Sequence, residues 1–342
     1  MRHDQVQRLL RHWTLEEFLK RKPPATVVLV RDRDTLLQVF TSFARHQIVS
    51  APVLSQEEAR YDRSLNVALL AWVPSQCDPA LIGDNLRQAG EKLTVATVSS
   101  IGLHDNAQLV YQAYLNTSLL EVIREGFLKP AAHGTPYHRL AVFDYDCAKA
   151  DPLDAAAGVH VTNIVSQTDI VAFLDKQRDS LKPLLDRSLT EAGLQPKPVL
   201  CVPAVMPAIN AFKAVLGSHV GCAGVVDLHR HGALVAQVST SDLRGLLPQH
   251  FQLLGLPVLE FLERSLGGWE PPPTSLTQTF GVKSPRKTTR DVRVETCSMQ
   301  STLGEVLARV VELHLHRLFV VDEENRPVNV ITLTDLLALL VG

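Results

Sequence analysis

Residues 294–341 read VETCSMQSTLGEVLARVVELHLHRLFVVDEENRPVNVITLTDLLALLV. Their apolar residues are spaced in ways that predict several helices and strands in succession. A short apolar stretch leads to Thr302-Leu303, which is typical of a helix start. The apolar residues that follow recur at i, i+3, i+4 and i+7, the spacing of an amphipathic helix: Leu303, Val306, Leu307, Val310 and Val311.

The second part of this stretch predicts a hairpin and another helix. Residues 318–321 are a continuous apolar run and predict one strand, residues 328–331 predict the next strand, and the segment 322–327 between them is typical of a turn. Thr332-x-x-Asp335 then opens a helix predicted over 336–340. The predicted order is strand, helix, strand, strand, helix, a mixed α/β (α+β) unit.

Two pairs of residues carry a resemblance to the CBS module, named after cystathionine β-synthase. They are His316-Arg317, before the first hairpin strand, and Thr332 with Asp335, where the last strand meets the last helix. The resemblance covers the whole stretch and implies the β-α-β-β-α fold of that family. It also implies that modules pair into Bateman-type tandems and commonly bind adenosine-containing ligands between them.

A second copy of the pattern precedes residue 175. His138-Arg139 lies before its hairpin, Asp144 follows five residues after the arginine, and Ser166-x-x-Asp169 marks the last junction. Its other predicted parts are a helix from Thr117, a strand at 140–143, an alanine-rich insertion at 145–158, a strand at 159–165 and a helix at 170–174.

A third copy follows residue 198. Cys222 stands where the arginine is expected, and Ser239-x-x-Asp242 marks the last junction. Its predicted elements are a helix from Ala208-Ile209, strands at 223–226 and 234–238 around the turn 229–232, and a helix at 243–247.

The first copy is the most divergent. Ser50 stands in place of the arginine, and Ser75-x-x-Asp78 lies between two prolines, so we do not expect the usual presentation of its carboxylate. Its predicted elements are strands at 27–30, 51–54 and 67–73 and a helix from Thr35-Leu36 with Val39, Phe40 and Phe43; a further strand is predicted at 92–99.

These copies predict a division of the chain into modules and connections. A helix over 248–268 is expected to pack on the second pair, and residues 270–293, polar and rich in proline, are expected to form a mobile loop. The predicted boundaries are an N-terminal helix at 1–24, module one at 25–88, module two at 89–178, a linker at 179–198, module three at 199–268, the loop at 269–293 and module four at 294–342.

Four CBS modules in one chain resemble the gamma subunit of AMP-activated protein kinase and its sucrose-non-fermenting relatives. The fourth copy, with Thr296-Cys-Ser and HRLFVVDEE…ITLTDLL, is most similar to plant and algal gamma-like proteins of that family. The resemblance implies a regulatory subunit that senses AMP, ADP or ATP, requires no other cofactor, and has catalytic (alpha) and scaffold (beta) kinase subunits as partners.

The same resemblance implies which residues contact nucleotide. A carboxylate at the strand-to-helix junction can accept hydrogen bonds from ribose hydroxyls, a helix start suits a phosphate, and an arginine can bind phosphate with two donors. The matching positions are Ser166, Asp169, Ser239, Asp242, Thr332, Asp335, His138, Arg139, His316 and Arg317. Because modules one and three lack the arginine, we expect fewer than four occupied sites.

Composition excludes several classes of protein. The net charge of −2 gives no basis for general nucleic-acid or membrane binding, and no apolar run reaches the roughly 18 residues that span a bilayer. The five cysteines are scattered, which predicts reduced and mostly buried thiols. The expected location is the cytoplasm, with the nucleus as a second location.

Alternatives to a nucleotide sensor remain at this point. Ser/Thr-x-x-Asp is also an ordinary N-cap with an acid in the first turn, so a CBS scaffold without ligand is the runner-up. An enzyme is not supported, because the phosphate-loop, nucleophile-elbow and zinc-protease motifs are all missing from the sequence. Monomer, homodimer and heterotrimer all remain open, including closure of the two tandems on each other within one chain.

Overall fold

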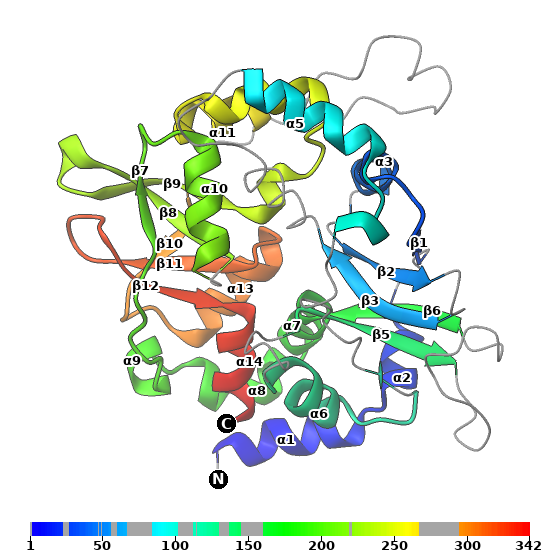
Figure 1. Cartoon of the computed structure of the whole chain (residues 1–342). Coiled ribbons are helices and arrows are strands. Elements are labelled where there is room, and N and C mark those ends of the chain that lie inside the picture. Colours follow the sequence, from blue (N-terminus) through cyan, green and yellow to red (C-terminus); the bar gives the residue numbers. More distant parts are fainter. Residues whose placement is uncertain are drawn as a thin grey trace.

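In the residues that it describes, the computed structural model has four small sheets of three strands each, with helices packed against them (Figure 1). It describes residues 2–22, 27–46, 48, 50–55, 60–66, 84–101, 112–113, 115–129, 137–144, 160–218, 221–266 and 294–342. In every sheet the first strand is parallel to the second, and the second and third form an antiparallel hairpin. Among these residues no helix is long and apolar enough to cross a membrane.

Module four follows the predicted order. Strand β10 (Thr296–Cys297) pairs with β11 (Arg317–Val321), which pairs with β12 (Pro327–Thr332). Helix α13 (Leu303–Glu312) connects the first two strands, and α14 (Leu333–Val341) follows the third. Four of the five predicted apolar positions of α13 are fully buried, because that face lies against the core.

Module two repeats this arrangement with one irregular helix. Its strands are β4 (Gln112–Ala113), β5 (Arg139–Asp144) and β6 (His160–Ser166). Helix α6 (Leu119–Glu121) continues as a π-helix, η4 (Val122–Leu128), and α7 (Gln167–Lys176) follows β6. The predicted insertion at 145–158 lies outside the described residues.

Module three has the predicted strands and first helix but not the predicted last helix. Its elements are β7 (Cys201–Pro203), α10 (Ala208–Gly217), β8 (Cys222–Asp227) and β9 (Ala233–Ser239). The helix predicted at 243–247 is wrong, because only a 3₁₀ turn, η7 (Thr240–Leu243), follows β9. The chain leaves this turn at Arg244, and Gly245 then has a φ of 85°.

The helix predicted over 248–268 is divided in two. A 3₁₀ segment, η8 (Pro248–Gly255), is followed by α11 (Val258–Leu266). Leu256 between them has extended backbone, with φ −71° and ψ 158°. The reason is Pro257, since a proline disfavours helical geometry in the residue before it.

Module one departs furthest from expectation. Its first strand, β1 (Val30–Arg31), includes only the last residue of the predicted 27–30. Helix α3 (Leu36–His46) and β2 (Ser50–Ser55) are where they were predicted. The third strand is β3 (Arg60–Asn66), earlier than predicted; the segment 67–73 and the pair Ser75 and Asp78 lie outside the described residues, as does the loop 270–293.

The strand predicted at 92–99 is also wrong. Helix α5 (Asp84–Val95) occupies the first half of this region, and the predicted boundary after residue 88 falls inside it. Leu86 anchors the helix in the core of modules one and three. Thr94 and Val95 are exposed in the last turn of α5, and beyond the helix Thr97 forms an isolated bridge with Thr35, so residues 92–99 contain no strand.

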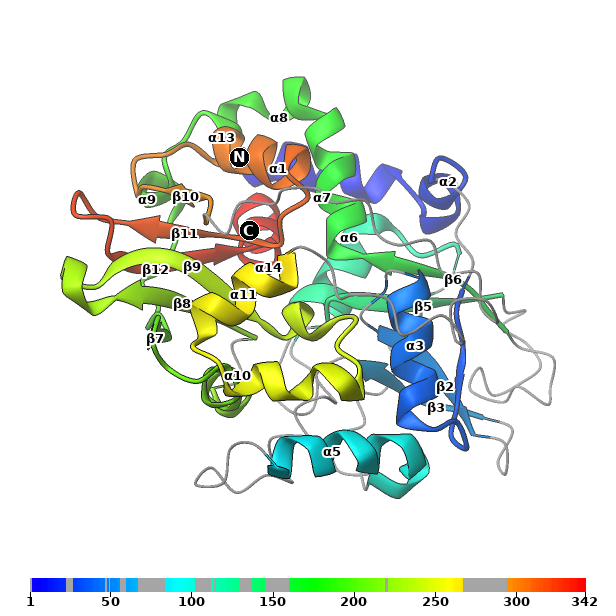
Figure 2. The same ribbon diagram turned by 90° about the horizontal axis from the view of Figure 1, so that it is seen from above.

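The modules form a closed arrangement within the single chain. The sheets of modules one and two lie on one side and those of modules three and four on the other, with helices between them (Figures 1 and 2). One apolar core joins the helices of modules two and four, and a second joins modules one and three. A small cluster of Cys222, Leu234 and Phe319 joins the sheets of modules three and four.

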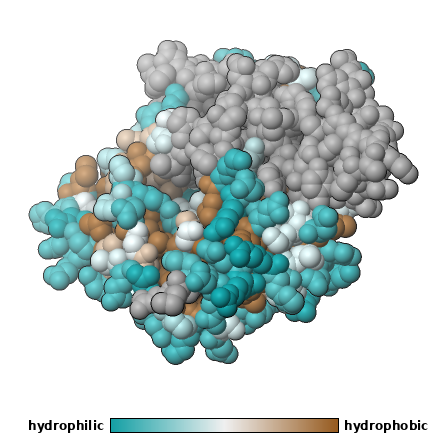
Figure 3. Space-filling model, turned by 90° about the horizontal axis from the view of Figure 1, so that it is seen from below, coloured by the Kyte–Doolittle hydropathy of each residue, from teal (hydrophilic) through white to brown (hydrophobic). Residues whose placement is uncertain are grey.

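The N-terminal helix and the linker cover modules two and four. Helix α1 (Arg2–His12) buries Val6 and Leu10 against α6, α14 and the linker helix α8 (Arg178–Leu185). After α1 comes the short α2 (Leu15–Leu19), and after α8 comes α9 (Leu189–Ala192), so the predicted linker is largely helical. The face in Figure 3 is mostly hydrophilic where it is described, with scattered apolar atoms.

Candidate functional site

The hairpins give four equivalent positions at which an arginine can stand. Arg139 is the register partner of Ser166, and Arg317 is the partner of Thr332. Cys222 is likewise paired with Ser239, and Ser50 with Asn66. Ser50 and Cys222 therefore occupy the arginine position of their modules, where neither can supply a positive charge.

Each of the three described junctions is a capping box. The Oδ2 atom of Asp169 accepts hydrogen bonds from the backbone nitrogen (2.8 Å) and hydroxyl (2.7 Å) of Ser166. Asp335 does the same for Thr332, at 2.9 and 2.7 Å, and Asp242 for Ser239, at 2.6 and 3.1 Å. The box precedes an α-helix in modules two and four and a 3₁₀ turn in module three, and any ligand must share these carboxylates with the caps.

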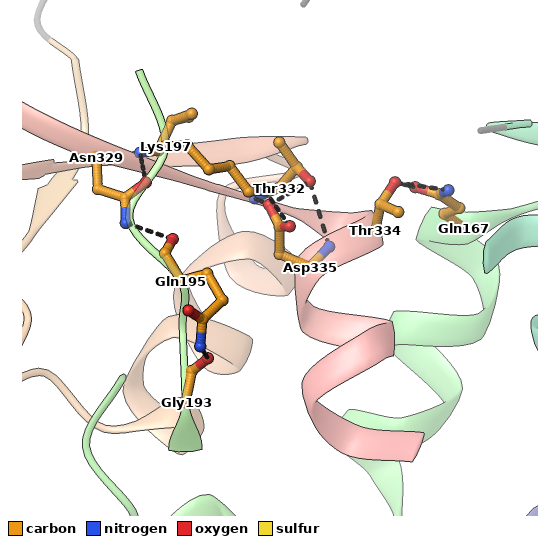
Figure 4. Close-up of polar contacts among 9 residues, drawn as sticks. Gln167, Gly193, Gln195, Lys197, Asn329, Thr332, Thr334 and Asp335 are labelled. Atoms are coloured by element: carbon orange, nitrogen blue, oxygen red, sulfur yellow. Dashed lines mark hydrogen bonds and ion pairs between the residues drawn. The ribbon is translucent and has the colours of Figure 1, made fainter. Parts of the chain in front are cut away.

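Two lysines contact the junction carboxylates of modules two and four, which we call the even modules. Lys22 Nζ lies 2.8 Å from Asp169 Oδ2 and donates to the carbonyl oxygen of Ile164 at 2.6 Å. Lys197 Nζ forms an ion pair with Asp335 Oδ1. Figure 4 shows Lys197 reaching Asp335 beside the cap of Thr332.

A cavity of about 220 Å³ lies between modules one and two and contains several predicted site residues. Arg139, Ser166 and Asp169 line it, and Arg139 Nη1 donates to Ser50 Oγ at 3.2 Å. The rest of its wall is Lys22 and the apolar side chains Val27, Val28, Ile48 and Ile164. The cavity therefore combines an apolar slot with a carboxylate at one junction and a guanidinium in the same wall.

Positive and imidazole groups from three modules interact near the junctions. Burial, and then the charges of Arg317 and Arg139, lower the pKa of His316 to about 4. Burial is also the main cause that lowers the pKa of His138, to which Arg317 and Arg139 contribute. The positive charge of Arg244 in module three acts on the same groups, since it lowers the pKa of both His316 and Arg139.

The junction of module three has a different character. Burial raises the pKa of the Asp242 carboxyl, while the hydrogen bonds from Ser239 and the charges of Arg317 and Arg244 oppose that shift. The Oε1 atom of Gln237 is buried without a hydrogen-bond partner among the described atoms. Gln237 stands two residues before Ser239, where Ile164 and Val330 stand in the even modules, so this junction is more polar.

The junctions of modules two and four contact each other directly. The buried Gln167 donates from Nε2 to Thr334 Oγ1 at 3.0 Å (Figure 4). It also donates to the carbonyl oxygen of Tyr137 at 2.9 Å. Thr168 Oγ1 lies 3.4 Å from His316 Nδ1. The first turns of α7 and α14 therefore share a polar contact in the middle of the molecule.

A second cavity, of about 300 Å³, lies in module four and contains none of the predicted site residues. It is lined by Cys297, Ser301, Glu305, Val306 and Arg309. Burial raises the pKa of the Cys297 thiol to about 11, so the thiol is protonated at neutral pH and is a poor nucleophile. No group of three potential metal ligands occurs in the part of the chain that is described.

Sequence reasoning missed Lys22, Lys197 and Arg244. The two lysines had a usable signal, because each is followed by proline and each precedes the first strand of an odd-numbered module. Arg244 had none, since it follows Asp242 in what was expected to be a helix. Its proximity to the other charges depends on how the modules pack.

Comparison with known proteins agrees with this architecture. The family model for the CBS domain matches residues 289–342. The SNF1-related protein kinase regulatory subunit gamma-like PV42a of Arabidopsis thaliana is 25% identical over 269 residues, 74% of this chain and 69% of the plant protein. Its name describes a regulatory subunit, in line with the prediction of a non-catalytic protein.

One solved structure covers nearly the whole chain and confirms the fold. Protein MJ1225 of Methanocaldococcus jannaschii, described as an archaeal homologue of the AMP-activated kinase gamma subunit, has a TM-score of 0.62 at 14% identity, covering 94% of this chain and 98% of that one. CBSX2, solved in complex with AMP, matches 44% of this chain and 94% of its own at 16% identity, with a TM-score of 0.28. This chain is a CBS-domain protein, distantly similar to the plant gamma-like subunits of SNF1-related protein kinase.

Proposed function

We propose that this chain is a non-catalytic regulatory subunit that binds an adenine nucleotide between paired CBS modules. The observation that carries the proposal is the cavity between modules one and two. Its apolar side chains suit the adenine ring, and its polar side chains surround the carboxylate and guanidinium of module two, which could orient a ligand. In this proposal the whole protein acts as the gamma-like subunit of an AMP-activated or SNF1-related protein kinase.

The contacts follow from the positions of the side chains. Asp169 would accept hydrogen bonds from the ribose hydroxyls, and Arg139 would bind phosphate. Burial lowers the pKa of Arg139, yet a guanidinium remains charged at neutral pH, so it keeps its attraction for phosphate. Arg317 and Arg244 would add to the positive potential that a triphosphate meets near the centre of the chain.

The corresponding junction of module four is the second proposed site. Thr332, Asp335, His316 and Arg317 would have the roles that Ser166, Asp169, His138 and Arg139 have in module two. Module three contributes Ser239 and Asp242, whose more polar surroundings we expect to favour a different ligand or weaker binding. The proposed partners remain a kinase catalytic subunit and its scaffold subunit, with no nucleic acid and no membrane.

Calorimetric titration of the purified chain with AMP and ATP tests this proposal. Removing a charge-assisted contact by Arg139→Ala or Asp169→Asn should cost about 1.5–3 kcal/mol, roughly ten-fold or more in affinity. The matched control is Asp186→Asn, which breaks an exposed ion pair with Lys182 on α8. Affinity that these two cavity variants leave unchanged would place the nucleotide elsewhere.

The second candidate is a CBS scaffold without ligand. It is favoured by the lysines, because ion pairs already engage the carboxylates of Asp169 and Asp335. This function predicts no heat and no thermal shift with millimolar AMP or ATP. Co-expression with the catalytic and scaffold subunits of an SNF1-related kinase then tests assembly, which either function allows.

A further inference from the structure

The two lysines occupy corresponding places in the two halves of the chain. Lys22 precedes the first strand of module one and contacts Asp169 of module two; Lys197 precedes the first strand of module three and contacts Asp335 of module four. Each is followed by a proline, which restricts the backbone of the lysine before it. The recurrence of one contact in both halves distinguishes it from a chance surface ion pair.

These contacts also differ from the other lysine ion pairs that the structure describes. The pairs of Lys20, Lys129 and Lys182 are i,i+4 contacts along single helices, and their lysines are 66–71% exposed. Lys22 is 17% exposed and its partner Asp169 25%, while Lys197 is 39% and Asp335 15% exposed. Desolvation makes an attraction between opposite charges stronger than it is at the surface.

The Lys22 ammonium lies at the wall of the cavity between modules one and two. It donates to the carboxylate of Asp169 and to the carbonyl oxygen of Ile164, and both residues line the cavity. A ribose diol, whose two hydroxyls are also donors, needs acceptors of this kind at this junction. Lysine and ribose would therefore use the same carboxylate.

We propose that Lys22 and Lys197 are intramolecular competitors that set ligand selectivity at the two even-module junctions. This inference rests on the proposed function. A nucleoside must displace the ammonium from its carboxylate and offers it no new anionic partner. A nucleotide also displaces it, but its phosphate gives the freed ammonium another negative group. The lysines thus select against adenosine and in favour of adenosine phosphates.

Titration of the full chain with adenosine, AMP and ATP tests this selectivity. In Lys22→Met we expect adenosine to bind about three- to ten-fold more tightly, the effect of losing one ion pair of moderate strength. We expect a smaller gain for AMP and the smallest for ATP. Lys197→Met should have the same pattern at the second site, and the double variant should show both changes.

Matched variants keep the result interpretable. Lys182→Met removes an exposed lysine pair on α8 and should leave all three affinities unchanged. If Lys22→Met lowers the thermal midpoint of unfolding, Lys22→Gln replaces it in the titrations, because glutamine removes the charge and keeps a polar side chain. Stronger binding of adenosine by the wild type than by Lys22→Met, or equal binding, overturns the inference.

The outcome also separates this inference from the proposed function. If the wild type binds AMP and Lys22→Met shows no gain for adenosine, only the role of the lysine is wrong. If adenosine binds Lys22→Met but not the wild type, the competition is supported directly. If none of the three ligands binds any variant, the nucleotide-binding function fails, and the inference fails with it.

Discussion

His316 is surrounded by groups that oppose its protonation. Burial, the arginines Arg317, Arg139 and Arg244, and the imidazole of His138 all lower its pKa, to about 4 from an ordinary 6.5. The unfolded chain therefore binds a proton at this residue at a higher pH than the folded chain does. The folded state loses stability as the pH falls from about 6.5 towards 4, and regains it as the pH rises.

The variant His316→Gln should weaken this dependence. Urea unfolding at pH 7 and pH 5 should show a smaller loss of unfolding free energy for the variant than for the wild type. Because His316 is exposed, solvent screens these charges, and we expect the variant to reduce the loss only modestly. His138→Gln should act in the same direction, since the pKa of His138 is lowered too. Equal losses in wild type and variants would contradict this account.

Single residues near the junctions were predictable to different degrees. The serine or threonine and the aspartate were found because a cap and its acid are three residues apart in the sequence. Lys22 is 147 residues from Asp169, and Lys197 is 138 from Asp335. Such pairs depend on which modules meet, and neither periodicity nor propensity carries that information.

Helix starts are the elements that sequence patterns locate best. The described helices include capping boxes at Thr14, Ser166, Ser188, Thr302 and Thr332. Each depends on a hydroxyl and an acid at fixed spacing, which is local information. The failures at 243–247 and 92–99 are of the opposite kind, because no cap marks them: Gly245 has a positive φ that ends the turn, and α5 continues to Val95.

Thr302→Ala should lower stability by about 0.5–2 kcal/mol, the usual cost of an N-cap. The hydroxyl of Thr302 accepts from Glu305 N at 3.1 Å, and this box lies at α13, not at a proposed ligand junction. Nucleotide affinity should therefore stay unchanged while the unfolding free energy falls. Thr302→Ser, which keeps the hydroxyl, is the control, and a loss as large as that of alanine would rule out the cap as the cause.

Closure of the four modules depends on helices that the division into modules does not include. Helix α1 contacts α6, α8 and α14, so it binds parts of modules two and four together with the linker. Gln7 Nε2 on this helix donates to the carbonyl oxygen of Val341 at 2.8 Å. The sequence predicted an N-terminal helix here, but which modules it covers follows only from the packing.

Leu10→Ala should be among the costly substitutions in α1. Its side chain is fully buried, and a leucine truncated in a core usually costs about 2–5 kcal/mol. Leu9→Ala removes the same atoms from a partly buried neighbour and should cost less. Urea unfolding of both variants checks the difference. Equal losses would mean that α1 does not anchor the closed arrangement.

The apolar cores that join module one to module three and module two to module four have a consequence for how the chain can diversify. Two copies of a two-module protein could build the same closed arrangement, but every substitution would then occur in both halves, because the two copies have one sequence. Fusion into one polypeptide removes that constraint. Ser50 and Cys222 already differ at one shared position, and β3 and β9 end in Asn66 and Ser239. One half can therefore drift or specialise through mutation while the other half keeps its ancestral role.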